Sequence, residues 1–206
     1  TPACQAYALT AIRFLAHINE DRRLLERAGA LELILEMLAP PATEHVQGCA
    51  ARALYSFLGD KGKYARVLRP AVMGDLVRLC AAHNKEAKQA AAAVLHRMVH
   101  DGGHSTCTAL EGTPDAVRNL VDMIHELSVD GCATLAYMAS NSEAVRQTVL
   151  DSDCTVSLLA MLDKNDVHSR LHAARLLRKI ASMGEPGQTQ VLESGGVDPL
   201  VRLTIV

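Results

Sequence analysis

The chain has 206 residues, of which 49% are hydrophobic and 3% aromatic, with 21 basic and 23 acidic side chains. This apolar content is sufficient for a buried core, and the nearly balanced charge excludes a global field that would recruit nucleic acid or an anionic membrane. The abundance of alanine and leucine favours closely packed helices over strands.

The six cysteines stand singly along the chain, without a Cys-x-x-Cys pair. Such thiols are typical of reducing compartments, so we expect a cytoplasmic or nuclear protein. No apolar run approaches the roughly 18 residues that cross a bilayer, and no signal-like start is present, which predicts no membrane span. Because the chain begins with "TPACQ", we expect it to be an excerpt of a longer protein.

A short pattern recurs along the chain with a nearly constant period. In each copy, a small or apolar residue precedes an aliphatic residue, two variable residues and another apolar residue. The copies are "AIRFL", "ALYSF", "VLHRM", "TLAYM" and "LLRKI", and their aliphatic second residues are Ile12, Leu54, Leu95, Leu135 and Leu177. We expect a helix centred near each of these residues, with the last four leucines buried.

A second ladder runs between these copies, in "ILEM", "LVRL", "LVDM", "LLAM" and "LVRL", which begin at Ile34, Leu76, Leu120, Leu158 and Leu200. Helix-start signals accompany it: Thr113 before Pro114 is typical of an N-cap, and Ser140 with Glu143 of a capping box. Short helices of this kind cannot bury an apolar face alone, so neighbouring repeats must stack.

The stretch "LLERAGALELILEMLA", followed by a polar loop and "EHVQGCAARALYSFLG", resembles an armadillo repeat: a short first helix, a glycine, a second helix, a loop and a long third helix. "VLESGGVDPLVRL" repeats the glycine-centred junction. The resemblance covers residues 1–206 as a single array of about four and a half repeats, and implies an all-α, right-handed α-solenoid. HEAT-like repeats are the nearest alternative, and Gly29 and Gly195 argue against them. Neither end carries a polar capping helix, so self-association through the ends is an open expectation.

In armadillo proteins the third helices line a concave groove, where asparagines, with tryptophans one turn earlier, hold an extended peptide. The asparagine position is occupied here by Phe14, Ser56, Arg97, Tyr137 and Lys179. The tryptophan position is occupied by Thr10, Arg52, Ala93, Ala133 and Arg175. Neither ladder is present, and the basic residues would repel a basic cargo, which argues against importin-α-like recognition of localisation signals.

The groove positions instead hold a set of basic and aromatic side chains that resembles the basic groove of β-catenin-like armadillo proteins. The candidate partner-binding residues are Arg52, Arg97, Tyr137, Arg175 and Lys179, flanked by Arg13, His96 and Arg178. Guanidinium and ammonium groups favour carboxylate or phosphate partners, and a tyrosine offers an anchor. The alternative is that these charges are the solvated faces of exposed helices.

The stretch "HRMVHDGGHSTC" sets His96, His100, His104 and Cys107 at intervals that could surround a metal ion. Histidines in the last turn of a helix also complement its negative end, and a glycine beyond them is an ordinary helix stop. Because the end of a helix accounts for the stretch, we predict no metal and no other cofactor.

The sequence holds no phosphate-binding glycine loop, nucleophile elbow or paired acid and base, so we predict that the chain is not an enzyme. The favoured function is a scaffold for protein–protein interaction that binds a partner segment, acidic or phosphorylated, in the concave groove. The alternative is a regulatory or co-chaperone-like armadillo domain that clamps a folded partner or controls an adjacent catalytic domain.

Overall fold

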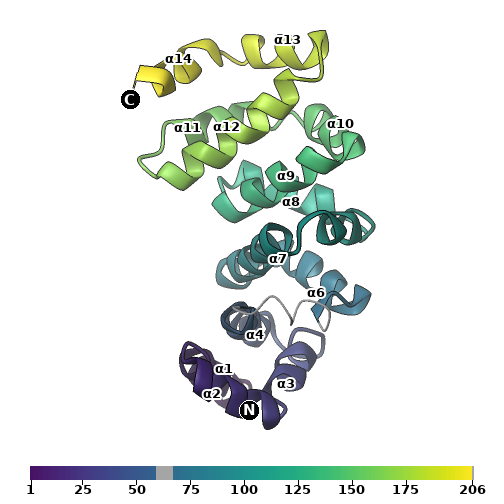
Figure 1. Cartoon of the computed structure of the whole chain (residues 1–206), viewed down its shortest axis with the longest axis vertical. Coiled ribbons are helices and arrows are strands. Elements are labelled where there is room, and N and C mark those ends of the chain that lie inside the picture. The colour runs from purple at the N-terminus through teal and green to yellow at the C-terminus, as the bar shows by residue number, and fades with distance from the viewer. Residues whose placement is uncertain (59–66, 206) are drawn as a thin grey trace. The chain divides into compact units, whose positions relative to one another are not determined.

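The computed structural model describes residues 1–58 and 67–205, and all regular secondary structure in these ranges is helical (Figure 1). The prediction of an all-α fold is therefore confirmed. The chain divides into two compact units, Thr1–Asp115 and Ala116–Val206. The single array over residues 1–206 stays a prediction.

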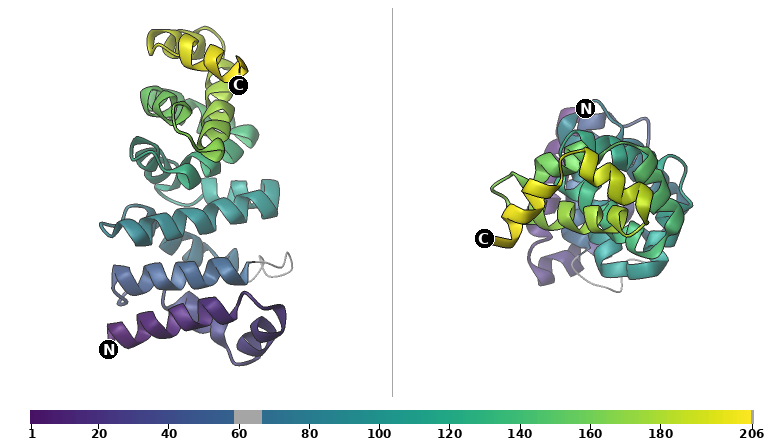
Figure 2. Two further views of the ribbon diagram at one scale, coloured as in Figure 1. Left: turned by 90° about the vertical axis from the view of Figure 1, so that its left-hand side faces the viewer. Right: turned by 90° about the horizontal axis from the view of Figure 1, so that it is seen from above.

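The first unit is built on three long helices that follow one another in a stack. Its helices are α1 (Pro2–Leu15), α2 (Asn19–Arg27), α3 (Ala30–Glu36), α4 (Glu44–Phe57), α6 (Pro70–Cys80) and α7 (Lys85–Glu111). The long helix α4 packs against both α1 and α7, and these three lie side by side like rungs in the left view of Figure 2. They are the third helices of the repeats, while α3 packs on α4 and α6 on α7.

The second unit repeats this arrangement around two third helices, α9 and α12, which pack against each other. Its helices are α8 (Ala116–His125), α9 (Val129–Asn141), α10 (Glu143–Asp151), α11 (Thr155–Leu162), α12 (Val167–Ala181), α13 (Glu185–Glu193) and α14 (Val197–Ile205). The second helices α8 and α11 pack on α9 and α12 respectively. Each third helix therefore buries one face against its own repeat and another against its neighbour.

The ladder leucines form the core of both units. Leu54, Leu95 and Leu135 are 0% exposed and Leu177 is 1% exposed, so their predicted burial is confirmed. Ile12 is half-buried. The predicted helix centres are less accurate, because the ladder residue lies in the second half of α1, α4 and α12. The apolar period fixes which face of a helix is buried and leaves its start undetermined.

The turns before the second helices use backbone with positive φ. Gly29 and Gly195 both have a φ of 78°, a conformation that costs glycine little, and these predicted junctions are confirmed. Asp115 and Asp153 occupy the same place before α8 and α11, with φ of 59° and 52°. Aspartate tolerates the left-handed region better than most residues, so two repeats make the same turn without glycine.

Two of the predicted helix starts are wrong. Ser140 still lies within α9, and its hydroxyl donates to the carbonyl of Ala136 at 2.9 Å. The N-cap of α10 is Ser142, whose oxygen accepts from the Val145 amide at 3.2 Å. Thr113 likewise donates back to Ala109 O at 3.0 Å, while α8 begins later, at Ala116. A cap needs extended backbone before the helix, which spacing alone does not reveal.

Large apolar side chains are exposed on the first helices of one unit and the last helices of the other. Tyr7 on α1 and Leu24 on α2 are 78% and 61% exposed, while Leu192 on α13 and Ile205 on α14 are 60% and 79% exposed. Self-association through the uncapped ends of the array stays a prediction. Among the described helices, none is both long enough and apolar enough to cross a membrane.

Candidate functional site

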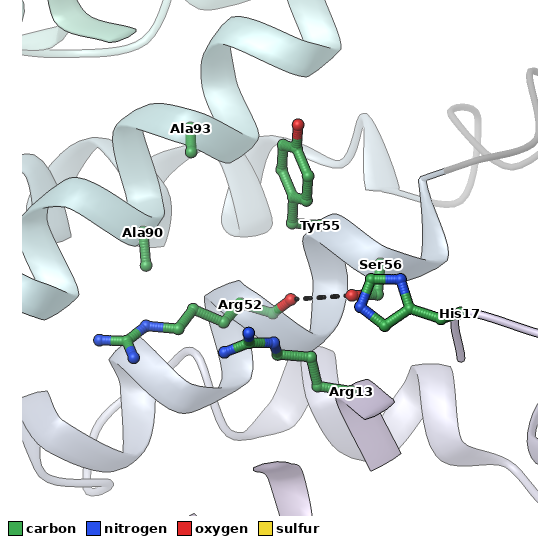
Figure 3. Close-up of a pocket in the computed structure, with 7 residues that line it drawn as sticks. All are labelled: Arg13, His17, Arg52, Tyr55, Ser56, Ala90 and Ala93. Carbon is green, nitrogen blue, oxygen red and sulfur yellow. Dashed lines mark hydrogen bonds between the residues drawn. The ribbon is translucent and has the colours of Figure 1, made fainter. Parts of the chain in front are cut away.

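A hollow of about 290 Å³ opens on the exposed faces of α1, α4 and α7 in the first unit. Its lining residues are Arg13, His17, Arg52, Tyr55, Ser56, Ala90 and Ala93 (Figure 3). The methyl side chains of Ala90 and Ala93 leave the space open on the α7 side. In Figure 3 the side chains of Arg13 and Arg52 extend to the same side of the hollow, while the ring of Tyr55 points away from both. The hollow therefore combines an apolar wall with two guanidinium groups.

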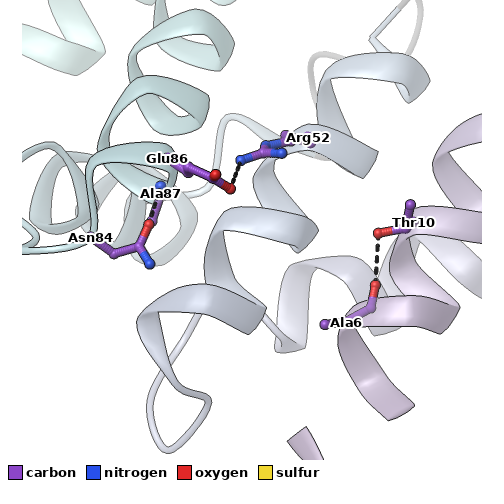
Figure 4. Close-up of polar contacts among 6 residues, drawn as sticks. All are labelled: Ala6, Thr10, Arg52, Asn84, Glu86 and Ala87. Carbon is purple, nitrogen blue, oxygen red and sulfur yellow. Dashed lines mark hydrogen bonds and ion pairs between the residues drawn. The ribbon is translucent and has the colours of Figure 1, made fainter. Parts of the chain in front are cut away.

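The charge of Arg52 is partly compensated by α7. Its Nη2 atom lies 2.6 Å from Oε2 of Glu86, in the first turn of that helix (Figure 4). The hydrogen bond and the positive charge of Arg52 lower the pKa of Glu86. The Arg13 guanidinium instead lies over the Phe14 ring, 5.1 Å from its centroid. Since cation–π contacts leave the positive charge in place, Arg13 can still attract an anion.

A second hollow of about 290 Å³ follows along α7, lined by Tyr55, His96, Arg97, His100 and Asp101. The Arg97 Nε lies 2.6 Å from Oδ2 of Asp101, and its guanidinium stands 5.6 Å from the centroid of the Tyr55 ring. Nδ1 of His100 lies 2.7 Å from the other Asp101 oxygen. Asp101 thus offsets the basic groups here, and Tyr55 forms a wall of both hollows.

The four metal-ligand candidates do not converge in the described structure. The His96 and His100 rings meet edge to face with centroids 6.3 Å apart. Gly103, with φ 62° and ψ −144°, interrupts the helical geometry before His104, and Cys107 is buried. Over residues 1–58 and 67–205, no group of three or more histidine, cysteine or acidic side chains could hold a metal ion. The absence of a metal stays a prediction.

The second unit has its own hollow, of about 340 Å³, between α9 and α12. Ala136, Tyr137 and Ser140 line it from α9, and Arg175 and Arg178 line it from α12. No acidic residue contributes to this lining. Among the ion pairs of the described residues, none involves Arg175 or Arg178. This hollow is therefore electropositive, unlike the second hollow of the first unit.

Four of the five candidate residues line these hollows: Arg52 and Arg97 in the first unit, and Tyr137 and Arg175 in the second. Lys179 is half-buried and lines none of the three. In contrast, the three flanking residues, Arg13, His96 and Arg178, each line a hollow. They share one repeat position, directly after the ladder aliphatic residue, and this position lines a hollow in every repeat: Arg13, Tyr55, His96, Ala136 and Arg178.

Several lining residues escaped the sequence analysis, among them His17, Tyr55, Asp101 and Ser140. Their signal is helical spacing: Tyr55 lies three residues after Arg52, Asp101 four after Arg97, and Ser140 three after Tyr137. Residues three and four apart are neighbours on a helix surface. Matching the family's asparagine and tryptophan positions alone left this neighbouring row out.

No protein family model matches the chain, and no curated protein matches it. Solved structures do. A designed armadillo repeat protein superposes with a TM-score of 0.75, at 21% identity over 96% of this chain and 84% of that chain. Another, computationally designed for modular peptide recognition, has a TM-score of 0.77, at 20% identity over 97% of this chain and 85% of that one. A third, in complex with the peptide (KR)4, has a TM-score of 0.72, at 21% identity over 96% and 83%. The armadillo-repeat fold expected from the sequence is thus confirmed.

Proposed function

We propose that the chain is a non-catalytic binding module, whose third helices hold an extended segment of a partner protein, acidic or phosphorylated. The main support for this proposal is that both units place arginine and tyrosine side chains around open hollows on these helices. Arg52 and Tyr55 share one hollow in the first unit, and Arg175 and Tyr137 share one in the second. Arginine forks match carboxylate and phosphate oxygens, and a tyrosine ring adds apolar contact.

The basic charge of the site favours a different ligand from the one bound to a designed protein of the same fold. That protein was solved with (KR)4, a basic peptide. Here Arg52, Arg97 and Arg175 project from the third helices. Like charges placed opposite each other disfavour binding, so the same fold should select an acidic segment here.

The proposal is tested on an array of acidic and basic peptides probed with the 206-residue chain. We expect retention of acidic peptides by the wild type and its loss in the double variant Arg97→Glu/Arg175→Glu. The double variant Arg23→Glu/Arg27→Glu is the matched control, because it changes net charge equally on α2, outside every hollow described. Thermal unfolding of each variant verifies its fold.

Equal loss in the control variant would assign the effect to net charge, and retention of basic peptides by the wild type would reverse the assigned ligand chemistry. The first result removes the groove from the proposal, and the second removes the acidic partner. Unchanged binding by Arg97→Glu/Arg175→Glu would move the site to another face.

The thiols support a reducing compartment, and we propose the cytoplasm or nucleus on this ground. None of the six cysteines, which all lie in the described ranges, forms a disulfide bond. Burial raises the pKa of Cys80 to about 12, and it also raises the pKa of Cys154. Buried thiols of this kind stay protonated and inert. Imaging of the tagged full-length protein tests the location, and secretion would contradict it.

A further inference from the structure

The hollows differ in how their arginines are compensated. Arg52 is paired with Glu86 at 2.6 Å, and Arg97 with Asp101 at 2.6 Å. Arg175 and Arg178 share the hollow of the second unit. No acidic residue lines it, as none lines the hollow of Arg13 and Arg52, but here none of the ion pairs of the described residues involves either arginine. An anion entering there meets two guanidinium groups and does not first have to displace a carboxylate.

The acidic residues on the same two helices do not offset this charge. Asp166, the N-cap of α12, accepts hydrogen bonds from the Ser169 amide at 2.8 Å and the Ser169 hydroxyl at 2.6 Å. It lies nine residues before Arg175, which is roughly 13 Å along a helix at 1.5 Å per residue. On α9 the acidic residue is Asp130, in the first turn, whereas Tyr137 and Ser140 lie toward the other end. Within α9 and α12 themselves, the ends that hold Tyr137, Ser140 and the two arginines thus carry basic and neutral groups.

Helix stabilisation accounts for only part of this cluster. Arg178 and Lys179 lie in the last turn of α12, where cations offset the negative end of the helix dipole. Arg175 lies before that turn. The dipole effect fades within about one turn, so it gives no reason for Arg175 beside Tyr137. A ligand with more than one negative charge would account for Arg175 at this position.

The lining chemistry fits a phosphate monoester. Two guanidinium groups bring two positive charges, and each can direct paired N–H donors at neighbouring oxygens. A carboxylate carries one charge, whereas a phosphorylated serine or threonine carries about −1.5 to −2 at neutral pH and three acceptor oxygens. The Ser140 hydroxyl donates to Ala136 O at 2.9 Å, so its oxygen remains an acceptor for an arginine N–H. The hollow can hold both arginines around one such group.

We propose that the hollow between α9 and α12 is a phosphate subsite, in which Arg175 and Arg178 bind a phosphorylated serine or threonine of the segment in the groove. The inference rests on the proposed function and narrows it.

The test uses the 206-residue chain and two probes. The first is O-phospho-L-serine, with L-serine as its matched partner, followed through NMR signals of α9, α12 and the arginine side chains. The second is a pair of peptide libraries with acidic flanks, one with a fixed phosphoserine and the other with serine. The variants are Arg175→Gln/Arg178→Gln and Arg175→Lys/Arg178→Lys. The controls are Arg170→Gln, on α12 but outside the hollow, and Arg52→Gln/Arg97→Gln.

We expect saturable shifts with phosphoserine on α9 and α12, and a preference of about tenfold or more for the phosphorylated library. Arg175→Gln/Arg178→Gln should abolish the preference and leave serine-library binding within about threefold. Arg175→Lys/Arg178→Lys should retain only part of the preference for the phosphorylated library, because an ammonium group lacks the planar, paired N–H donors of a guanidinium. Arg170→Gln should change nothing. Arg52→Gln/Arg97→Gln should preserve the ratio of binding between the two libraries, because it leaves the hollow of the second unit intact.

Failure of the subsite and failure of the proposed function give different results. If both libraries bind equally, or if the preference follows Arg52 and Arg97, the phosphate subsite is overturned while groove binding stands. If phosphoserine shifts the α9 and α12 signals but neither library binds, the subsite stands and the proposed function fails. No saturable shift with phosphoserine overturns the subsite whatever the libraries do.

Discussion

Leu95 and Leu135 hold the same place in the repeat, one in each unit, and both are 0% exposed. Replacing either by alanine should lower the free energy of unfolding by about 2–5 kcal/mol, because methyl groups are lost and a cavity remains. Leu24→Ala and Leu192→Ala are matched controls at 61% and 60% exposure, and should change it by less than about 0.5 kcal/mol. Urea denaturation measures all four. A loss below about 1 kcal/mol at both core positions would contradict the ladder register.

Gly48 and Gly74 lie within helices α4 and α6, and only the first is closely approached. A Cβ on Gly48 would stand 2.8 Å from the Cα of Ala87 on α7, a backbone atom, whereas nothing lies within 4 Å of a Cβ on Gly74. Gly48→Ala should therefore destabilise the chain by forcing α4 from α7. Gly74→Ala should stabilise it by about 0.5–1 kcal/mol through backbone entropy. Thermal unfolding compares the two, and equal shifts would disprove close contact at Gly48.

At the scale of the element, one carboxylate joins two third helices. Glu44 is the first residue of α4, and its oxygens accept from the backbone amides of Asn84 at 2.7 Å and His83 at 3.3 Å, just before α7. Asn84 in turn caps α7 by accepting from the Ala87 amide at 3.0 Å. The backbone hydrogen bond from Asn84, and to a smaller extent the one from His83, lowers the pKa of Glu44. The backbone amides at the start of α7 thus find acceptors in the helix's own N-cap and in the preceding repeat.

Glu44→Gln should lower the melting temperature at neutral pH, because the amide is a weaker acceptor for these N–H groups. Since the folded pKa of Glu44 lies below its unfolded value, its contribution is complete above the unfolded value and is lost as the pH falls through the folded one. The difference between wild type and variant should therefore begin to shrink as the pH falls below the ordinary glutamate pKa of about 4.3, and should vanish below the lowered folded pKa. Glu36→Gln, an exposed change on α3, is the control. A difference independent of pH would contradict this role.

The sequence predicts the buried faces of these helices well and their ends poorly. Leu54 and Leu95 are set by a period, and burial of a periodic face is a property of many residues together. A helix end depends on one or two backbone conformations, and Ser142 in place of Ser140 differs from the prediction by half a turn. Asp115 and Asp153 adopt positive φ where the pattern suggests glycine. Such choices depend on neighbouring helices, which spacing does not record.

The hollows that contain Arg52 and Arg175 are positively charged, although the chain in total is negative. The chain has a formal net charge of −2, yet its hollows are lined by arginines. If the groove binds an acidic peptide, the dissociation constant should rise between about 0.05 and 0.5 M salt, because screening weakens the attraction. Long-range repulsion by the total charge would make it fall. Fluorescence titration decides the sign, and Arg52→Gln/Arg97→Gln should flatten the salt dependence.

The site itself could be predicted only to the level of repeat position. The match to the family places Arg52, Arg97, Tyr137 and Arg175 on the hollows, because the repeat carries its geometry with it. It does not reveal that Glu86 pairs with Arg52, since the two are 34 residues apart and meet only when α4 and α7 stack. Nor does it indicate that Arg178, and not Lys179, lines the hollow of the second unit. Whether an arginine is paired with a carboxylate depends on how the helices pack, and the hollows differ in this pairing.

Tyr55 stands between two hollows of the first unit, with the Arg97 guanidinium 5.6 Å from its ring centroid. A side chain that enters one hollow and turns this ring changes the shape of the other. Residue preferences at two positions of a bound segment would then be interdependent, and scoring them separately would misjudge good ligands. Double-mutant cycles between those ligand positions should show a coupling energy that Tyr55→Ala removes. Tyr55 would thus make the contribution of one ligand residue to affinity depend on the residue bound in the neighbouring hollow.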